Sequence, residues 1–126
     1  MKKTLFLFSV LMFLSCKKES QESFGKVEKT TEVQKPVDLG KSIFEGKGVC
    51  VACHKTDVKL VGPSLQDIAK IYKDKKGNMV TFLKGEGQPI VDPTKYELMK
   101  PNLTITKTFT DEELKALETY VYSNLK

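Results

Sequence analysis

Residues 50–54 read Cys-Val-Ala-Cys-His, and this motif restricts what the chain can fold around more than any other feature. It places two thiols and one imidazole within a short stretch of backbone. His54 is the only histidine in the sequence, and the only other cysteine, Cys16, lies far upstream. The three side chains of the motif therefore have to act together, either on one another or on a group that the chain binds.

Four kinds of chemistry compete for this motif, and covalent haem attachment explains all three side chains. In c-type attachment, Cys50 and Cys53 form thioethers with the two vinyl groups of the porphyrin, and His54 becomes an axial ligand of the iron. A thioredoxin-like pair needs a preceding strand, which the sequence does not predict. A zinc site needs four ligands, and a structural disulfide leaves His54 without a role. The sequence therefore predicts one covalent haem c with its iron.

Residues 1–15 have the features of an export signal. A short positive region precedes an apolar run over residues 5–14, which is too short to span a bilayer of about 30 Å as a helix. The sequence Phe-Leu-Ser-Cys that ends at Cys16 is similar to the lipobox of bacterial lipoproteins, in which the cysteine is acylated. We expect a lipoprotein signal peptide, a lipid on Cys16 and a location in the bacterial cell envelope facing the periplasm. The alternative is an ordinary signal peptide with an incidental Cys16.

The segment after Cys16 has the composition of a flexible tether. Residues 17–37 are rich in Lys, Glu, Ser, Gln and Thr and hold few apolar side chains. Such a segment cannot bury enough surface to offset the entropy lost on ordering. We therefore expect the lipidated cysteine and a flexible tether over residues 16–37, and one folded domain over 38–126. A pendant helix is the alternative for the tether.

Apolar spacing and capping residues in the domain predict an all-α fold of about four short helices. The predicted helices cover about residues 38–47, 65–73, 79–84 and 111–124. Ser64 and Asn78 are expected to cap the second and third helices, and Thr110 opens a capping box with Glu113. Residues 85–103, which contain three prolines, are predicted to form a long irregular loop. Loops of this length are uncommon unless they are functional.

Charge and composition argue against nucleic-acid binding. The formal net charge is +5. However, the sequence contains no arginine to bind phosphates or bases in a bidentate manner, and no basic run. We therefore expect no nucleic-acid partner.

The stretch from about Leu39 to Leu125 resembles a class I cytochrome c domain. Gly40 and Phe44 are similar to the glycine and the aromatic residue of that family's first helix, and residues 62–65, Gly-Pro-Ser-Leu, to its Gly-Pro-x-Leu. The resemblance implies the class I fold, with the helices wrapped round one covalent haem. It also implies that the first helix crosses the last helix near residues 117–121.

The resemblance assigns roles to further residues. The Pro63 carbonyl would accept a hydrogen bond from Nδ1 of His54, and Leu65 would pack on the haem. A methionine in the loop before the last helix would be the sixth iron ligand, and Met99 occupies that place, with one lysine between it and the next proline. Met79 lies in a helical apolar pattern, where methionine usually fills the core. The alternatives to Met99 are Met79 or no methionine ligand.

Two axial ligands saturate the iron, which favours electron transfer over catalysis. The resemblance implies a monomeric electron carrier without enzymatic activity, cycling between Fe(III) and Fe(II). It would pass single electrons between membrane redox complexes and a terminal enzyme, with its lipid in the membrane. The alternatives are a dedicated haem subunit of one periplasmic reductase or oxidase, or a ligand-binding five-coordinate haem protein. Lys55, Lys59 and Lys100, beside the expected ligands, are candidates for steering an acidic partner.

Overall fold

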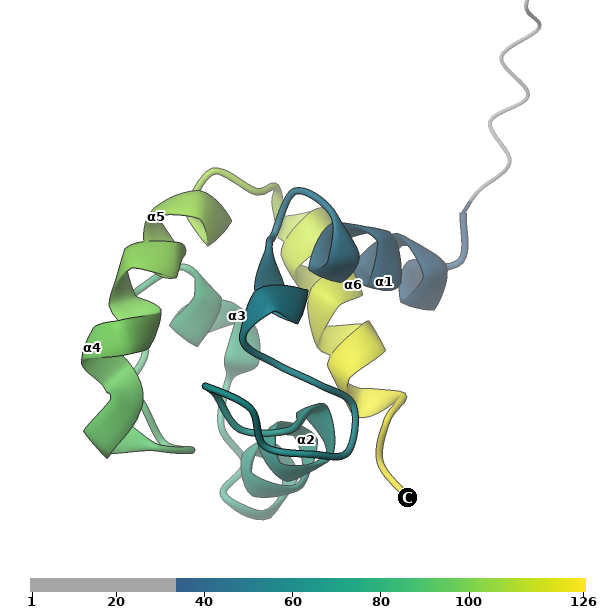
Figure 1. The fold of residues 1–126 in the computed structure, drawn as a ribbon. Coiled ribbons are helices and arrows are strands. Elements are labelled where there is room, and N and C mark those ends of the chain that lie inside the picture. Colours follow the sequence, from purple (N-terminus) through teal and green to yellow (C-terminus); the bar gives the residue numbers. More distant parts are fainter. Residues whose placement is uncertain (1–33) are drawn as a thin grey trace, which may run out of the picture. The chain divides into compact units, whose positions relative to one another are not determined.

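The computed structural model describes residues 34–126, which form six α-helices, three 3₁₀ helices and no strand (Figure 1). In chain order these are α1 (Pro36–Glu45), η1 (Cys50–Ala52), α2 (Leu65–Asp74), α3 (Met79–Leu83), η2 (Pro93–Lys95), α4 (Tyr96–Met99), η3 (Lys100–Asn102), α5 (Leu103–Thr106) and α6 (Asp111–Tyr122). The predicted all-α class is confirmed. The expected signal peptide, the lipid on Cys16 and the tether up to residue 33 lie outside the described residues. None of the described helices has the length and apolar run needed to cross a bilayer.

The central packing contact is the crossing of α1 and α6 (Figure 1). A Cβ on Gly40 would lie 2.0 Å from the carbonyl oxygen of Ala116 and 2.7 Å from Cβ of Tyr120, so only glycine allows this approach. Beside the contact, the Phe44 and Tyr120 rings pack with their centroids 5.4 Å apart. Leu117 of α6 is buried in the same core. The crossing therefore lies where the resemblance implied.

Side-chain caps fix the starts of α2 and α3 at the predicted positions. Oγ of Ser64 accepts the backbone N–H of Asp67 at 3.1 Å. Oδ1 of Asn78 accepts the N–H of Thr81 at 2.8 Å. These side chains satisfy N–H groups that have no partner inside the helix, so both helices begin directly after their caps.

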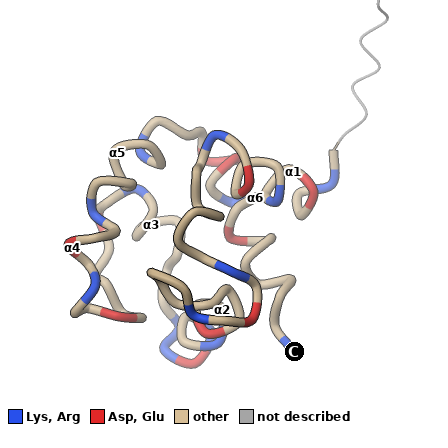
Figure 2. The backbone as a smooth tube through the Cα atoms, viewed as in Figure 1, with Lys and Arg blue, Asp and Glu red and all other residues tan. Residues whose placement is uncertain are grey.

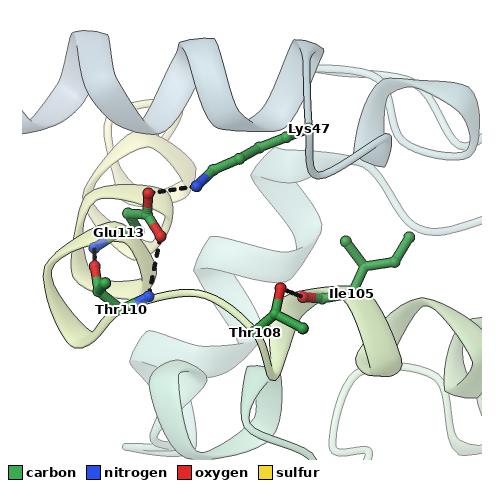
Figure 3. Close-up of polar contacts among 5 residues, drawn as sticks. All are labelled: Lys47, Ile105, Thr108, Thr110 and Glu113. Atoms are coloured by element: carbon green, nitrogen blue, oxygen red, sulfur yellow. Dashed lines mark hydrogen bonds and ion pairs between the residues drawn. The ribbon is translucent and has the colours of Figure 1, made fainter.

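A capping box joins the start of α6 to the loop after α1, as Figure 3 shows. Thr110 Oγ1 accepts the Glu113 N–H at 3.2 Å, and the Glu113 carboxylate accepts the Thr110 N–H at 3.0 Å. The same carboxylate forms an ion pair with Lys47. The Lys47 ammonium also lies 4.5 Å from the centroid of the Phe109 ring. The predicted capping box is confirmed, and Lys47 connects it to the segment that leads into the Cys-x-x-Cys-His motif.

Helix α3 ends at the predicted glycine. Gly85 has φ of +74°, and its N–H donates to the Phe82 carbonyl at 2.8 Å. The N–H of Glu86 donates to the Thr81 carbonyl at 3.1 Å. This pattern is a Schellman motif, which needs a residue in the left-handed conformation, and glycine adopts it without steric cost.

The expected irregular loop over residues 85–103 was wrong in its second half. From residue 93 onward the chain forms η2, α4, η3 and α5 in close succession. Pro93 and Pro101 lie in the first turn of 3₁₀ helices, where the missing N–H of proline would have no helical partner in any case. The prolines therefore start short helices here instead of breaking them. In the same way, α1 begins at Pro36, two residues before the predicted start.

Candidate cofactor site

One largely apolar cavity lies among the helices, with about 1010 Å³ of space free of atoms, part of it open to solvent. All six residues predicted to bind the cofactor line it: Cys50, Cys53, His54, Pro63, Leu65 and Met99. These residues come from three separate segments of the chain, so only the fold brings them together. Their roles as attachment points and ligands remain predictions from the sequence.

A tight turn presents the two thiols and the imidazole to this cavity. The turn begins at Val49, whose φ of +53° is unusual for a β-branched residue. It continues through η1, and the N–H groups of Cys53 and His54 both donate to the Cys50 carbonyl, at 3.1 and 3.0 Å. Cys50 and Cys53 are partly buried and form no disulfide. The turn therefore keeps both sulfur atoms available for bonds to another group.

Burial raises the pKa of the Cys50 thiol to about 11, so it is protonated at neutral pH. A thiol of a redox-active pair normally has a lowered pKa, because the thiolate is the nucleophile. The raised pKa of Cys50, together with the lack of a strand among the described residues, does not fit the thioredoxin-like alternative. Among the described residues, no group of three or more His, Cys, Asp or Glu side chains is placed to hold a metal ion.

The imidazole of His54 is held in one orientation. Its Nδ1 lies 2.7 Å from the carbonyl oxygen of Pro63, which can only accept, so Nδ1 carries the proton. Nε2 is then left with a free electron pair, as a metal ligand requires. A Cβ on Gly62 would lie 2.4 Å from Cε1 of the ring, so the backbone passes directly beside it. The site therefore fits an axial histidine ligand with a fixed tautomer.

Met99 is the last residue of α4 and is partly buried at the cavity wall. Lys100, which follows it, points elsewhere: its side chain is 59% exposed and forms an ion pair with Glu97 at 3.6 Å. The intervening lysine therefore does not take the place of Met99 in the cavity. Met79 also lines the cavity, but it is only 3% exposed and belongs to the core cluster.

Several cavity residues were missed by the sequence analysis, chiefly the aromatic row of Tyr72, Phe82 and Tyr96. Their ring centroids lie 6.4 Å apart for Tyr72 and Phe82, and 6.3 Å apart for Phe82 and Tyr96. Burial raises the pKa of the Tyr72 hydroxyl, so this group stays neutral. Asn102 also lines the cavity. If residues 96–106 had been predicted to be helical, Tyr96 and Asn102 would have been expected at the cavity. Each lies three positions from Met99 and shares its face of the helix.

Charged and apolar side chains share the rim of the cavity. Lys59 pairs with Asp92 at 3.4 Å, and the Thr94 hydroxyl donates to the same carboxylate at 2.6 Å. The Thr94 hydroxyl and the Lys59 ammonium hold the pKa of Asp92 below its usual value. Val61 and Leu98 line the cavity, yet they are 49% and 60% exposed. Figure 2 shows lysines and acidic residues interspersed over the described helices.

A helical domain that encloses an apolar cavity beside Cys-x-x-Cys-His has the architecture of a haem-binding protein of the c type. The sequence model of the cytochrome c family matches residues 37–124. The chain is 43% identical over 53 residues to cytochrome c-552 of Nitrosomonas europaea, a match that covers 42% of this chain and 46% of that protein. It is 32% identical over 84 residues to cytochrome c-551 of Pseudomonas aeruginosa, covering 64% of this chain and 72% of that protein. It is also 32% identical over 87 residues to cytochrome c-551 of Stutzerimonas stutzeri, covering 67% and 75%.

The chain belongs to the cytochrome c family. It carries one covalently bound haem c with its iron, and Cys50 and Cys53 fit the attachment motif. The match spans less than half of the length of cytochrome c-552 and about three quarters of the length of the two c-551 proteins.

Proposed function

We propose that this protein is an electron carrier that is not itself an enzyme, in which one haem iron cycles between Fe(III) and Fe(II). The observation that carries the proposal is the meeting of His54 and Met99 at one apolar cavity, although they lie far apart in the sequence. With both as axial ligands, the iron has no position left for a substrate. An iron that exchanges electrons without binding small molecules is suited to transfer between proteins.

The residues of this chain have distinct roles in that function. Cys50 and Cys53 would hold the porphyrin through thioether bonds, and the Pro63 carbonyl keeps His54 in an orientation that would offer Nε2 to the iron. Leu65, which is 1% exposed and lines the cavity, would pack on the ring and exclude water. When bound, the haem supplies one-electron chemistry, and a dry site with a methionine ligand favours its reduced form.

The absorption spectrum and a redox titration test the proposal. We expect the reduced protein to give the sharp α band of low-spin haem, and carbon monoxide to leave that band in place. The titration should fit one reversible one-electron step. A reduced spectrum that carbon monoxide converts fully would point to an open iron position and would contradict the carrier.

The rim of the cavity is the face that we propose for contact with redox protein partners, namely a membrane donor complex and a terminal acceptor. Val61 and Leu98 are exposed apolar side chains at the cavity wall, and a docked partner would bury them. The expected role of the lysines is smaller than the sequence suggested. Lys59 is paired with Asp92, and Lys100 with Glu97, so part of their charge is compensated locally.

We further propose that the protein is a lipoprotein anchored in the bacterial cell envelope and facing the periplasm. The support is the lipobox-like sequence ending at Cys16, followed by a polar segment before the family match begins at residue 37. In this proposal residues 1–15 are the signal peptide and 16–37 the lipidated tether. More than one acyl chain is needed for stable anchoring.

Detergent partition tests the anchor separately from the haem chemistry. The mature protein should enter the detergent phase and carry the added mass of acyl chains on Cys16. Cys16→Ser should stay out of the detergent phase or remain uncut, with an unchanged haem spectrum. A wild-type protein with an unmodified Cys16 would rule out the lipoprotein.

A further inference from the structure

Residues 96–106, which run from α4 to α5 and include Met99, contact two neighbouring residues of α3. One of these contacts lies at each end of the segment. At the start, the Tyr96 ring packs on the Phe82 ring, with centroids 6.3 Å apart at an angle of 53°. At the end, the Thr106 hydroxyl donates to the Leu83 carbonyl at 2.6 Å. Met99 lies between these two contacts, which we call the α3 clamp.

The Thr106 side chain is buried, and its hydroxyl reaches a half-buried carbonyl at the end of a helix. The Schellman motif of α3 pairs the carbonyls of Thr81 and Phe82 with backbone N–H groups. The carbonyl of Leu83, the last residue of the helix, is reached instead by Thr106, which is only 1% exposed. Removing the hydroxyl would leave this half-buried carbonyl without its side-chain partner, which is unfavourable.

The neighbouring side chain reinforces this end of the clamp. A Cβ on Gly85 would lie 2.3 Å from Cε of Lys107, so the Lys107 chain lies directly over the glycine that ends α3. Helix α3 is itself well fixed, because Asn78 caps it, it packs against α6 and its Met79 is 3% exposed. The clamp therefore ties a segment of short helices to a rigid part of the domain.

The geometry points to Thr106 and Tyr96 as positioning residues that hold the Met99 sulfur at the cavity through α3. This inference rests on the proposed function, in which Met99 is the sixth ligand. A methionine ligand leaves the iron only when its backbone segment moves, so the contacts that hold the segment set the balance between bound and released states. Both clamp contacts belong to the state with Met99 at the cavity.

Imidazole is a suitable probe of this balance, because it binds the oxidised iron only when the methionine has left. Its apparent affinity therefore rises in proportion to the fraction of released protein. The penalty for an unpaired, fully buried carbonyl corresponds to about five- to hundredfold in an equilibrium constant, and the Leu83 carbonyl is half-buried, so the upper end of that range is not expected. In Thr106→Val we expect imidazole to bind about five- to fiftyfold more tightly than in the wild type, with a lower reduction potential.

Two matched variants separate the hydroxyl from the rest of the side chain. Thr106→Ser keeps the donor and should stay within about twofold of the wild type. Thr108→Val removes a hydroxyl that donates to the Ile105 carbonyl at 2.7 Å on the surface of the same segment (Figure 3). It does not contact α3, so its imidazole affinity should also stay near that of the wild type.

The other end of the clamp provides an independent measurement if Thr106→Val fails to fold. Tyr96→Leu removes the ring that packs on Phe82 and should also tighten imidazole binding severalfold, whereas Tyr96→Phe keeps the ring and should not. The clamp would be only structural if Thr106→Val and Tyr96→Leu lowered thermal stability but left imidazole affinity unchanged. If the oxidised wild type lacked the sulfur-to-iron charge-transfer band, the assignment of Met99 as ligand would fail instead.

Discussion

At the scale of single residues, the site depends on backbone that approaches the His54 ring closely. The Pro63 carbonyl orients the imidazole, and Gly62 leaves room for it. In the proposed function, the apolar walls would supply the surroundings in which His54 and Met99 raise the potential of the iron. Substitutions at these positions should change the absorption spectrum of the haem even where the fold is retained.

Gly62→Ala should displace the imidazole. The new Cβ would lie 2.4 Å from Cε1 of His54, far inside van der Waals contact. We expect at least half of the protein to lose the low-spin spectrum, or to lose covalent haem, as measured by spectroscopy and by haem staining on denaturing gels. Val61→Ala, one residue earlier, leaves the ring undisturbed and should retain both signals.

Met99→Ala should open one position on the iron. We expect the reduced variant to bind carbon monoxide and the potential to fall, because the thioether no longer favours Fe(II). Met79→Leu is the matched control, since Met79 is buried in the core cluster and leucine conserves most of its volume. Carbon monoxide binding by Met79→Leu, but not by Met99→Ala, would reverse the ligand assignment.

At the scale of elements, two contacts between segments hold the helices around the cavity. One is the crossing of α1 and α6 at Gly40, and the other is the capping box at the start of α6. The first is a contact between backbones, which cannot be adjusted by moving a side chain. The second is polar and partly exposed, so it depends on pH and salt.

Gly40→Ala should destabilise the domain despite the better helix propensity of alanine. The added Cβ would lie 2.0 Å from the Ala116 carbonyl oxygen, so the two helices have to separate. Overpacking of this kind costs about 1–3 kcal/mol, and alanine regains at most about 1 kcal/mol. Thermal unfolding should show a clear fall in Tm, whereas Lys41→Ala, at the next and exposed position, should leave Tm nearly unchanged.

Glu113→Gln should reduce stability more at pH 7 than at pH 3. The Lys47 ammonium and the Thr110 N–H lower the pKa of Glu113 below its usual value of 4.5. A lowered pKa means that the stabilisation is present above pH 4.5 and is lost as the pH falls through the folded-state value. The effect should stay below about 1 kcal/mol, because the pair is partly exposed. An equal loss of Tm at both pH values would show that the charge of Glu113 is irrelevant.

At the scale of the whole molecule, the cavity wall carries exposed apolar side chains, and two lysines next to lining residues, Lys59 and Lys100, already have acidic neighbours. Apolar contact and charge steering differ in their response to salt. Screening lengths fall from about 30 Å near 0.01 M salt to about 8 Å at 0.15 M. The salt dependence of electron transfer therefore reports which of the two dominates.

We expect apolar contact to dominate. Val61→Ser together with Leu98→Ser should slow electron transfer to the physiological partner severalfold at both low and high salt. Replacing Lys55, Lys59 and Lys100 by Gln should slow it only at low salt, and by less. Stopped-flow rates measure both effects.

The control for charge is a triple substitution on α2 and the turn after it, Lys70, Lys73 and Lys75 to Gln. If this variant slowed the reaction as much as the replacement of Lys55, Lys59 and Lys100, only the net charge of the protein would matter. Those three lysines would then have no special role in docking. If the serine variant had no effect at either salt concentration, apolar docking at the rim would have to be abandoned.

The sequence by itself determined the cofactor class, the all-α fold and the starts of three helices. Each of these depends on residues close together in the chain. Two cysteines and a histidine in five residues specify the attachment chemistry, and Ser64, Asn78 and Thr110 cap helices through partners three positions away. Local geometry of this kind is largely independent of the rest of the fold.

Only the tertiary structure decided how the segment around Met99 is built and held. Its three prolines predicted an irregular loop, but packing of Tyr96 on Phe82 and burial of Thr106 against Leu83 accompany a run of short helices. Helices of four residues are not stable alone, because the cost of forming the first turn exceeds what so few hydrogen bonds return. They exist here because a partner from elsewhere in the chain stabilises them, and no pattern within the segment itself reveals that partner.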